Sequence, residues 1–312
     1  MPPTDDTKPQ KDRSTASNDG TPPMKVAVIG GAGHIGSWFT EHFTSKGLPT
    51  VIADTRMDEA RAIADATGAE LAHSNLEAVE GVDAVLICVP IKKTGEVISE
   101  ITPRMKKGAL LAELSSVKAT TLKHLRAAAQ TGVKPLSIHP LFGPAADGLK
   151  GKTILVVPVM DGEEEATSAK QLFGEAEIIV VGPEEHDRAM ASVLSLTYFM
   201  NMAFAGILGE EDLLRTKKLS GTTFTVQLVV TESIIGEDPG LVSSLLSENP
   251  YTQEYLDRYI SEAEHIRTLL KDDPQGLQKL HGSLAKSMSR DPDFRHADER
   301  RYRAFKALNS HG

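Results

Sequence analysis

Short runs of Val, Ile and Leu alternate with amphipathic stretches between Met24 and residue 182, and this alternation constrains the fold more than any other feature. The predicted strands span residues 25–29, 50–53, 84–89, 109–114, 135–138, 153–158 and 177–181. Segments with a helical spacing of apolar residues lie between several of these strands, for example 36–47, 57–68 and 119–132. Strands that alternate with helices indicate parallel strands joined by crossover helices. The sequence therefore predicts the α/β class, with a doubly wound, Rossmann-type parallel sheet.

The strand signals stop after Gly182-Pro183, and the rest of the chain has helical patterns. The predicted helices lie near residues 184–209, 223–236, 249–271, 274–289 and 297–308. We therefore expect the sheet domain over 24–182 and an all-helical domain over 183–312. The segment 191–208 is more apolar than a lone small bundle requires. We expect a second subunit to cover part of it, so that the chain forms a homodimer.

The first 23 residues and the overall charge exclude several classes of protein. Residues 1–23 contain almost no apolar side chains, so this segment is predicted to be a disordered tail. The net charge of -9 disfavours a surface for nucleic acid or for an anionic membrane. One cysteine, Cys88, fits a reducing compartment. We find no signal peptide and no apolar stretch of transmembrane length, and we expect a cytoplasmic protein without nucleic-acid or membrane partners.

A glycine-rich turn follows the first predicted strand and opens the first predicted helix. Gly31, Gly33 and Gly36 form the pattern G-x-G-x-x-G. These glycines allow a tight turn, a close approach of the backbone to a pyrophosphate and close packing of the helix, whose N-terminus adds positive potential. The domain over 24–182 is therefore predicted to bind a dinucleotide. The expected cofactor-binding residues are Gly31, Gly33, His34, Ile35, Gly36, Asp54, Val89 and Pro90.

The carboxylate at the end of the second predicted strand indicates which dinucleotide is bound. Asp54 lies 18 residues after Gly36, where a carboxylate can hold the hydroxyl groups of the adenosine ribose. It would repel a ribose 2′-phosphate, so NAD is favoured over NADP. Arg56, two residues further on, leaves NADP open.

Two other predicted strands also end in polar residues. The stretch "ELSSVK" carries Ser116 and Lys118, which by themselves could simply begin the next helix. The stretch "LSIHPLFGPAADG" carries His139, which Pro140 keeps extended. Ligands of doubly wound sheets bind beyond the carboxyl ends of the strands, so these residues are expected at the same crevice as the glycine turn.

The motifs together resemble the prephenate dehydrogenase family of tyrosine biosynthesis, over about residues 24–270. The resemblance rests on the glycine turn, "SVK", "IHPLFGP", "HDRAMA" at 186–191 and "ENPY" at 248–251. It implies that His139 is the catalytic histidine, that Ser116 is its hydrogen-bonding neighbour and that the helical domain is a dimerisation domain. It also implies an NAD(P)-dependent oxidative decarboxylation of prephenate to 4-hydroxyphenylpyruvate. An imidazole suits the removal of the ring hydroxyl proton, because its pKa lies near working pH.

Two positions depart from the family pattern. Tyr198 stands where the family often has histidine. Ser233 stands where an arginine is expected to bind a substrate carboxylate. No arginine occurs from 216 to 257. A nearby cation could substitute, from Arg215, Lys217 or Lys218, or the natural substrate could differ. The residues expected to bind substrate are Lys118, His186, Tyr198 and Ser233, and a purely structural role for His186 is equally open.

Several functions therefore stay open. The first is a prephenate dehydrogenase, and close to it stands a dehydrogenase for arogenate or 4-amino-4-deoxyprephenate. Another small-molecule reductase on the same domain plan is less compatible with "IHPLFGP" and "SVK". A non-catalytic dinucleotide-sensing protein is conceivable because of Tyr198 and Ser233. The histidines outside these motifs show no metal-type pairing, so no metal site is expected.

Overall fold

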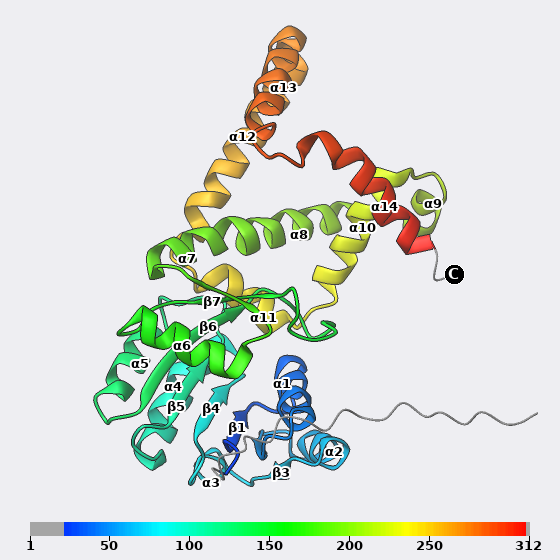
Figure 1. Cartoon of the computed structure of the whole chain (residues 1–312). Coiled ribbons are helices and arrows are strands. Elements are labelled where there is room, and N and C mark those ends of the chain that lie inside the picture. Colours follow the sequence, from blue (N-terminus) through cyan, green and yellow to red (C-terminus); the bar gives the residue numbers. More distant parts are fainter. Residues whose placement is uncertain (1–21, 310–312) are drawn as a thin grey trace, which may run out of the picture. The chain divides into compact units, whose positions relative to one another are not determined.

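The computed structural model describes residues 22–309, and within them one sheet contains eight strands (Figure 1). The predicted tail over 1–23 lies outside the described residues except for its last two positions. The strands are β1 (Val26–Ile29), β2 (Thr50–Ala53), β3 (Glu70–Leu71), β4 (Ala84–Ile87), β5 (Leu110–Glu113), β6 (Lys134–Pro140), β7 (Thr153–Val156) and β8 (Glu177–Val180). Their order is β3-β2-β1-β4-β5-β6-β7-β8.

The predicted α/β fold with a Rossmann-type sheet is confirmed, with two corrections. β6 and β7 are antiparallel, whereas the other neighbouring strands are parallel. No helix occupies residues 141–152 between β6 and β7, and antiparallel strands need no crossover helix. The sequence also missed β3, because a strand of two residues gives no readable pattern.

The strand order places the glycine turn at a topological switch point. From β1 the chain moves outward to β2 and β3, and then returns to the other side of β1 with β4. Ligands of open α/β sheets bind beyond the carboxyl ends of the strands at such a point. Gly31 follows β1 and Val89 follows β4, so the predicted cofactor residues flank the switch point.

The helices between these strands pack on the sheet around a hydrophobic core that contains several aromatic side chains. They are α1 (His34–Ser45), α2 (Met57–Thr67), α3 (Asn75–Ala78), α4 (Ile91–Ile101), α5 (Leu122–Ala129) and α6 (Gly162–Phe173). Phe39 and Phe43 of α1 are fully buried together with Phe173 of α6. Ring centroids of Phe39 and Phe173 lie 5.6 Å apart in an edge-to-face arrangement. Burying each such ring stabilises the fold by about 1.5–3 kcal/mol.

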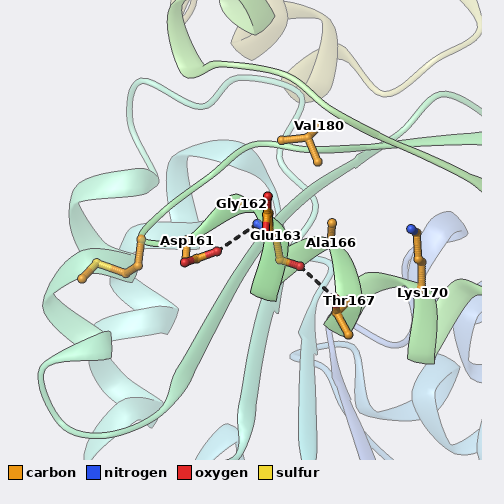
Figure 2. A pocket seen from close by; sticks show the side chains of 8 residues that line it. Asp161, Gly162, Glu163, Ala166, Thr167, Lys170 and Val180 are labelled. Atoms are coloured by element: carbon orange, nitrogen blue, oxygen red, sulfur yellow. Dashed lines mark hydrogen bonds between the residues drawn. The ribbon is translucent and has the colours of Figure 1, made fainter.

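The N-terminus of α6 lies beside a surface hollow that Val180 and Lys170 help to line (Figure 2). Asp161 caps this helix, because its carboxylate accepts the N–H groups of Glu163 and Glu164 at 2.9 and 3.0 Å. The helix therefore satisfies its own first turn, and the hollow is a structural feature of the helix start.

The second compact unit consists of residues 90–92, 116–121 and 181–309, while the first contains 22–89, 93–115 and 122–180. Its regular elements are α7 (Pro183–Met190), the π-helical turn η2 (Ala191–Leu196), α8 (Thr197–Leu208), α9 (Leu213–Lys218), α10 (Thr222–Ile235), α11 (Pro239–Ser247), α12 (Thr252–Asp272), α13 (Pro274–Met288), the 3-10 turn η3 (Phe294–His296) and α14 (Ala297–Asn309). The predicted all-helical character is confirmed. The sequence missed α9, α11 and the π turn, and it started α12 three residues early.

One helical run in the described part of the chain is long and apolar enough to cross a membrane by length and composition alone. It spans Pro183–Leu208, with a mean hydropathy of 1.5 in its most apolar window. The expectation that no such stretch exists was therefore wrong. A single run of this kind is weak evidence for a membrane span, because the core helix of a soluble protein passes the same test. Only 17% of the window is buried within this chain, and Val193 and Ile207 are 56% and 67% exposed.

Candidate active site

The turn after β1 has the shape that a pyrophosphate requires. Gly30 has a φ of 83°, which favours glycine, and a Cβ on Gly36 would lie 2.1 Å from the carbonyl oxygen of Gly30. A side chain at Gly36 would therefore force α1 away from the turn, and a Cβ on Gly30 would lie 2.6 Å from the carbonyl oxygen of Cys88. Gly33 begins α1 without a side-chain cap, and the first turn of α1 contains no acidic residue. The N-terminal N–H groups of α1 thus lack the cap that α6 has, and they fit an anionic ligand.

Asp54 contacts this turn directly. Its Oδ2 accepts the backbone N–H of Ala32 at 3.0 Å, and its Oδ1 accepts the backbone N–H of Arg56 at 2.9 Å. The side chain of Asp54 is 7% exposed, whereas that of Arg56 is 52% exposed. A carboxylate has about four acceptor positions, so Asp54 can hold the turn and still accept ribose hydroxyls. The residues present therefore fit a dinucleotide.

Arg56 and Val89 border the same turn. A Cβ on Gly33 would lie 3.8 Å from Nη2 of Arg56, and a Cβ on Gly30 would lie 3.1 Å from Cγ1 of Val89. Val89 thus covers one side of the turn, and the Arg56 guanidinium lies on another. Pro90, the next residue, is exposed and belongs to the helical unit.

His139 lies within β6 and not after it, because the strand continues to Pro140. Its backbone pairs with Leu155 of β7, and the residue is 6% exposed. The carboxyl ends of β1, β4, β5 and β6 share one edge of the sheet, since these strands are mutually parallel. His139 therefore lies at the same edge as the glycine turn, three strand spacings or about 14 Å away.

A buried carboxylate that the sequence analysis missed lies beside this strand. Glu113 ends β5, is 0% exposed and pairs in register with Ser137. Its Oε1 accepts the Ser137 hydroxyl at 2.5 Å, and its Oε2 accepts the backbone N–H of Ser115 at 2.7 Å. Ser137 and His139 lie on the same face of β6, because side chains alternate along a strand. The single acidic residue in the apolar run "ALLAEL" was the available signal.

The loop after His139 is attached to α1. The indole N–H of Trp38 donates to the carbonyl of Ala146 at 2.8 Å. The Phe142 ring packs against Trp38 with a centroid distance of 5.2 Å. The helix that starts at the glycine turn therefore also positions the loop of "IHPLFGPAADG".

In the helical unit, Asp187 brings three of the sequence motifs together. Its carboxylate accepts the backbone N–H groups of Lys118 and Ala119 at 2.9 and 2.8 Å. Its backbone carbonyl accepts the side-chain amide of Asn249 at 2.7 Å. Asp187 of "HDRAMA" thus joins the "SVK" segment to the "ENPY" segment, and the sequence analysis did not single it out.

Lys118 and His186 are both 0% exposed. Nδ1 of His186 lies 2.8 Å from Oδ1 of Asp187. Ser116, by contrast, is only half-buried. Of the predicted residues in this segment, Ser116 is therefore the one with surface left to meet a ligand.

Tyr198 of α8 is paired with Glu237, which follows α10. The Tyr198 hydroxyl lies 2.9 and 2.8 Å from the two carboxylate oxygens of Glu237 and donates to them. Burial and this carboxylate raise the pKa of Tyr198 above its usual value, so the phenol stays protonated and remains a donor. Tyr198 also packs against the buried cluster of Ile91, Val117 and Leu245.

The predicted substitutes for the missing arginine lie on α9. Nζ of Lys217 pairs with Glu232 at 3.3 Å, and the side chains of both residues are 48% exposed. Ser233, on α10, is exposed. Between residues 22 and 309, no three His, Cys, Asp or Glu side chains are grouped so that they could hold a metal ion.

Two family models match the chain. One, described as the nucleotide-binding domain of prephenate dehydrogenase, matches residues 44–155, and the other, described as the prephenate dehydrogenase dimerization domain, matches residues 182–288. Together they match parts of both units, and the first match begins after the glycine turn.

Individual proteins agree with this assignment. A probable arogenate/prephenate dehydrogenase of Methanocaldococcus jannaschii is 26% identical over 84% of this chain, and the match spans 60% of that protein. A 4-amino-4-deoxyprephenate dehydrogenase of Streptomyces pristinaespiralis is 25% identical, over 72% of this chain and 78% of that protein. The crystal structure of Aquifex aeolicus prephenate dehydrogenase with hydroxyphenyl propionate and NAD+ has a TM-score of 0.70 at 19% identity. It covers 88% of this chain and 100% of that one. This chain belongs to the prephenate dehydrogenase family.

Proposed function

We propose that this chain is an NAD-dependent dehydrogenase that oxidatively decarboxylates prephenate, or a close cyclohexadienyl analogue, in tyrosine biosynthesis. The observation that carries the proposal is the shared sheet edge of His139 and the uncapped glycine turn of α1. The two family models add the expected order of a nucleotide-binding region followed by a dimerisation region.

His139 is the proposed general base. It would accept the proton of the hydroxyl group on ring carbon C4 as that carbon is oxidised and the carboxylate on C1 leaves as carbon dioxide. NAD, when bound, supplies the hydride acceptor. An imidazole is suited to the proton transfer because its ordinary pKa lies near neutral pH. The pairing of His139 with Leu155 and the Trp38–Ala146 hydrogen bond support a fixed position for the imidazole and its loop.

The other site residues have supporting roles in this proposal. Ser116 is our candidate for the hydroxyl that orients the reacting group. The complete burial of Lys118 and His186 favours a role in supporting the "SVK" segment over direct contact with substrate. Tyr198 and Ser233 stay candidates for substrate recognition, and Tyr198 is argued further below.

We propose NAD as the preferred coenzyme. The buried carboxylate of Asp54 supports this choice, because a 2′-phosphate would be repelled there. The exposed guanidinium of Arg56 could still attract that phosphate, so some activity with NADP is expected. We also propose a homodimer formed through the helical unit, in a cytoplasmic enzyme without nucleic-acid or membrane partners.

Coenzyme reduction with prephenate is the direct test. The purified protein is mixed with prephenate and with NAD or NADP, and the reduced coenzyme and 4-hydroxyphenylpyruvate are both measured. Arogenate and 4-amino-4-deoxyprephenate are assayed in parallel. Reduction with at least one of these substrates is expected. Binding of NAD without turnover of any of them would instead favour the dinucleotide-sensing alternative.

A further inference from the structure

Glu237 of the helical unit pairs with a neutral phenol and not with a cation. Two other acidic residues of the helical unit have cationic partners: Glu232 pairs with Lys217 at 3.3 Å, and Glu248 pairs with Lys92 at 3.5 Å. Among residues 22–309, Glu237 has no Lys, Arg or His within ion-pair distance. Its described partner is the Tyr198 hydroxyl, which is neutral. The phenol therefore fixes the direction of the carboxylate but leaves its charge uncompensated.

Glu237 lines an apolar hollow of about 500 Å³, whose other lining residues belong to α8, α10 and α11. The hollow is lined by Met202, Ile234, Ile235, Pro239, Val242 and Leu246, with Glu237, Ser243 and Ser247 as its polar members. Glu237 is the charged member of this lining. A fixed negative charge at the wall of an apolar hollow attracts a cation more strongly than the same charge in water, because the local dielectric constant is lower.

The pair also lies close to a segment of the proposed active site. Tyr198 packs against the buried cluster of Ile91, Val117 and Leu245, and Val117 stands between Ser116 and Lys118 of the "SSVK" segment. Ile91 of the same cluster directly follows Pro90. Tyr198 therefore links Glu237 to a cluster that contains residues from the segments after β4 and β5. α10 itself contains no lysine or arginine that could attract a second carboxylate of the substrate.

We infer that Glu237, oriented by Tyr198, recognises an ammonium group, and that the preferred substrate is a cyclohexadienyl compound that carries one. This inference rests on the proposed dehydrogenase function and names the substrate class for it. Arogenate carries the ammonium group on its side chain, and 4-amino-4-deoxyprephenate carries it at ring carbon C4. Prephenate carries none, so the uncompensated charge of Glu237 discriminates against it.

The first experiment compares kcat/KM for these three substrates with four proteins: wild type, Glu237→Gln, Tyr198→Phe and the control Glu232→Gln. Glu232 lies on α10 but does not line the hollow. We expect wild type to prefer one of the two amine-bearing substrates. Glu237→Gln loses a charge-assisted hydrogen bond to the ammonium group. Its kcat/KM for the preferred amine-bearing substrate should therefore fall by about 10-fold to 100-fold, whereas its kcat/KM for prephenate should be unchanged or raised. Tyr198→Phe should change the ratio in the same direction but less, and Glu232→Gln should leave it unchanged.

The second experiment measures binding without turnover. Oxidative decarboxylation of arogenate yields L-tyrosine, and that of prephenate yields 4-hydroxyphenylpyruvate, which lacks the ammonium group. Isothermal titration with both products in the presence of NAD should show tighter binding of tyrosine to wild type if arogenate is the preferred substrate. Glu237→Gln should abolish that preference.

The outcomes separate this inference from the function on which it rests. If wild type reduces coenzyme best with prephenate, or if Glu237→Gln leaves the substrate ratio unchanged, the ammonium assignment is wrong and the dehydrogenase function stands. An equal loss for all three substrates, together with a lower melting temperature or a changed oligomeric state, would make the pair structural and also overturn the assignment. Reduction with none of the substrates by a folded wild-type protein would overturn both.

Discussion

The carboxylate of Asp187 accepts the backbone N–H of Lys118 at 2.9 Å, across 69 residues of sequence. A second N–H, from Ala119, reaches its other oxygen at 2.8 Å. One buried carboxylate therefore holds the shape of the segment that carries Ser116. Asp187 is itself 3% exposed, so water cannot replace its partners.

Replacing Asp187 should for this reason damage both stability and turnover. Asp187→Ala leaves the buried N–H of Lys118 without an acceptor, which costs about 1–3 kcal/mol, and also removes the acceptor of the part-buried N–H of Ala119. We expect a lower melting temperature and a lower kcat, with Asp187→Asn intermediate because it keeps one acceptor oxygen. Thermal unfolding and steady-state kinetics on the same preparations measure both effects. Asp257→Asn, at an exposed position on α12, is the control, and an equal effect there would refute the special role of Asp187.

The proposed role of His139 predicts a loss of rate without a loss of coenzyme binding. General base catalysis typically contributes about 10²–10⁴-fold, so His139→Asn should lower kcat within that range while the Kd for NAD stays close to wild type. Ser116→Ala should cost less, because that hydroxyl only orients the reacting group.

The pH profile provides an independent check on His139. Wild-type kcat/KM should fall as pH decreases through the pKa of the histidine, because the protonated imidazole cannot accept a proton. His139→Asn should lack this acidic limb. If instead the variant shows near-normal kcat and a lower melting temperature, His139 serves packing within β6 and the mechanism is wrong.

Coenzyme choice should depend on Asp54 and Arg56 in opposite directions. Asp54→Ala removes the charge that repels a 2′-phosphate, so the ratio of kcat/KM for NADP over NAD should rise. Arg56→Ala removes the cation beside Gly33 and should lower the same ratio. Both ratios come from initial rates with saturating substrate. Asp54→Ala also removes the acceptor for the Ala32 N–H, so some loss of kcat/KM with NAD is expected. An unchanged ratio of kcat/KM for NADP over NAD would show that Asp54 does not contact the ribose.

The sequence predicted the fold well where the information is local. The position of each main strand follows from its apolar run, and the glycine turn from its spacing. The direction of β7 could not be predicted, because an apolar run is the same in a parallel and an antiparallel strand. The π turn over Ala191–Leu196 was hidden for a similar reason, since its residues are also ordinary in an α-helix.

The candidate site was predictable residue by residue but not as a set of contacts. His139 and Ser116 were found from motifs. Glu113 was missed because its hydrogen bond to Ser137 joins two neighbouring strands that are distant in the sequence. Asp187 and the Tyr198–Glu237 pair were missed because their partners lie 69 and 39 residues away. Long-range pairing of this kind follows from packing, and no local pattern in the sequence encodes it.

Self-association should depend on the apolar side chains that α8 and α10 expose. Ile207 is 67% exposed and Val230 is 42% exposed, and the family model that matches this region is a dimerization domain. Exposed apolar side chains along two helices are typical of an interface that a second subunit covers. Light scattering at micromolar concentration should therefore give the mass of a dimer for wild type. Ile207→Glu and Val230→Asp should shift the protein toward monomer, because each would bury an unpaired charge at the interface. Arg61→Glu, an exposed change on α2 of the sheet unit, is the control and should stay dimeric. A monomeric wild type would remove the inference that another copy covers these helices.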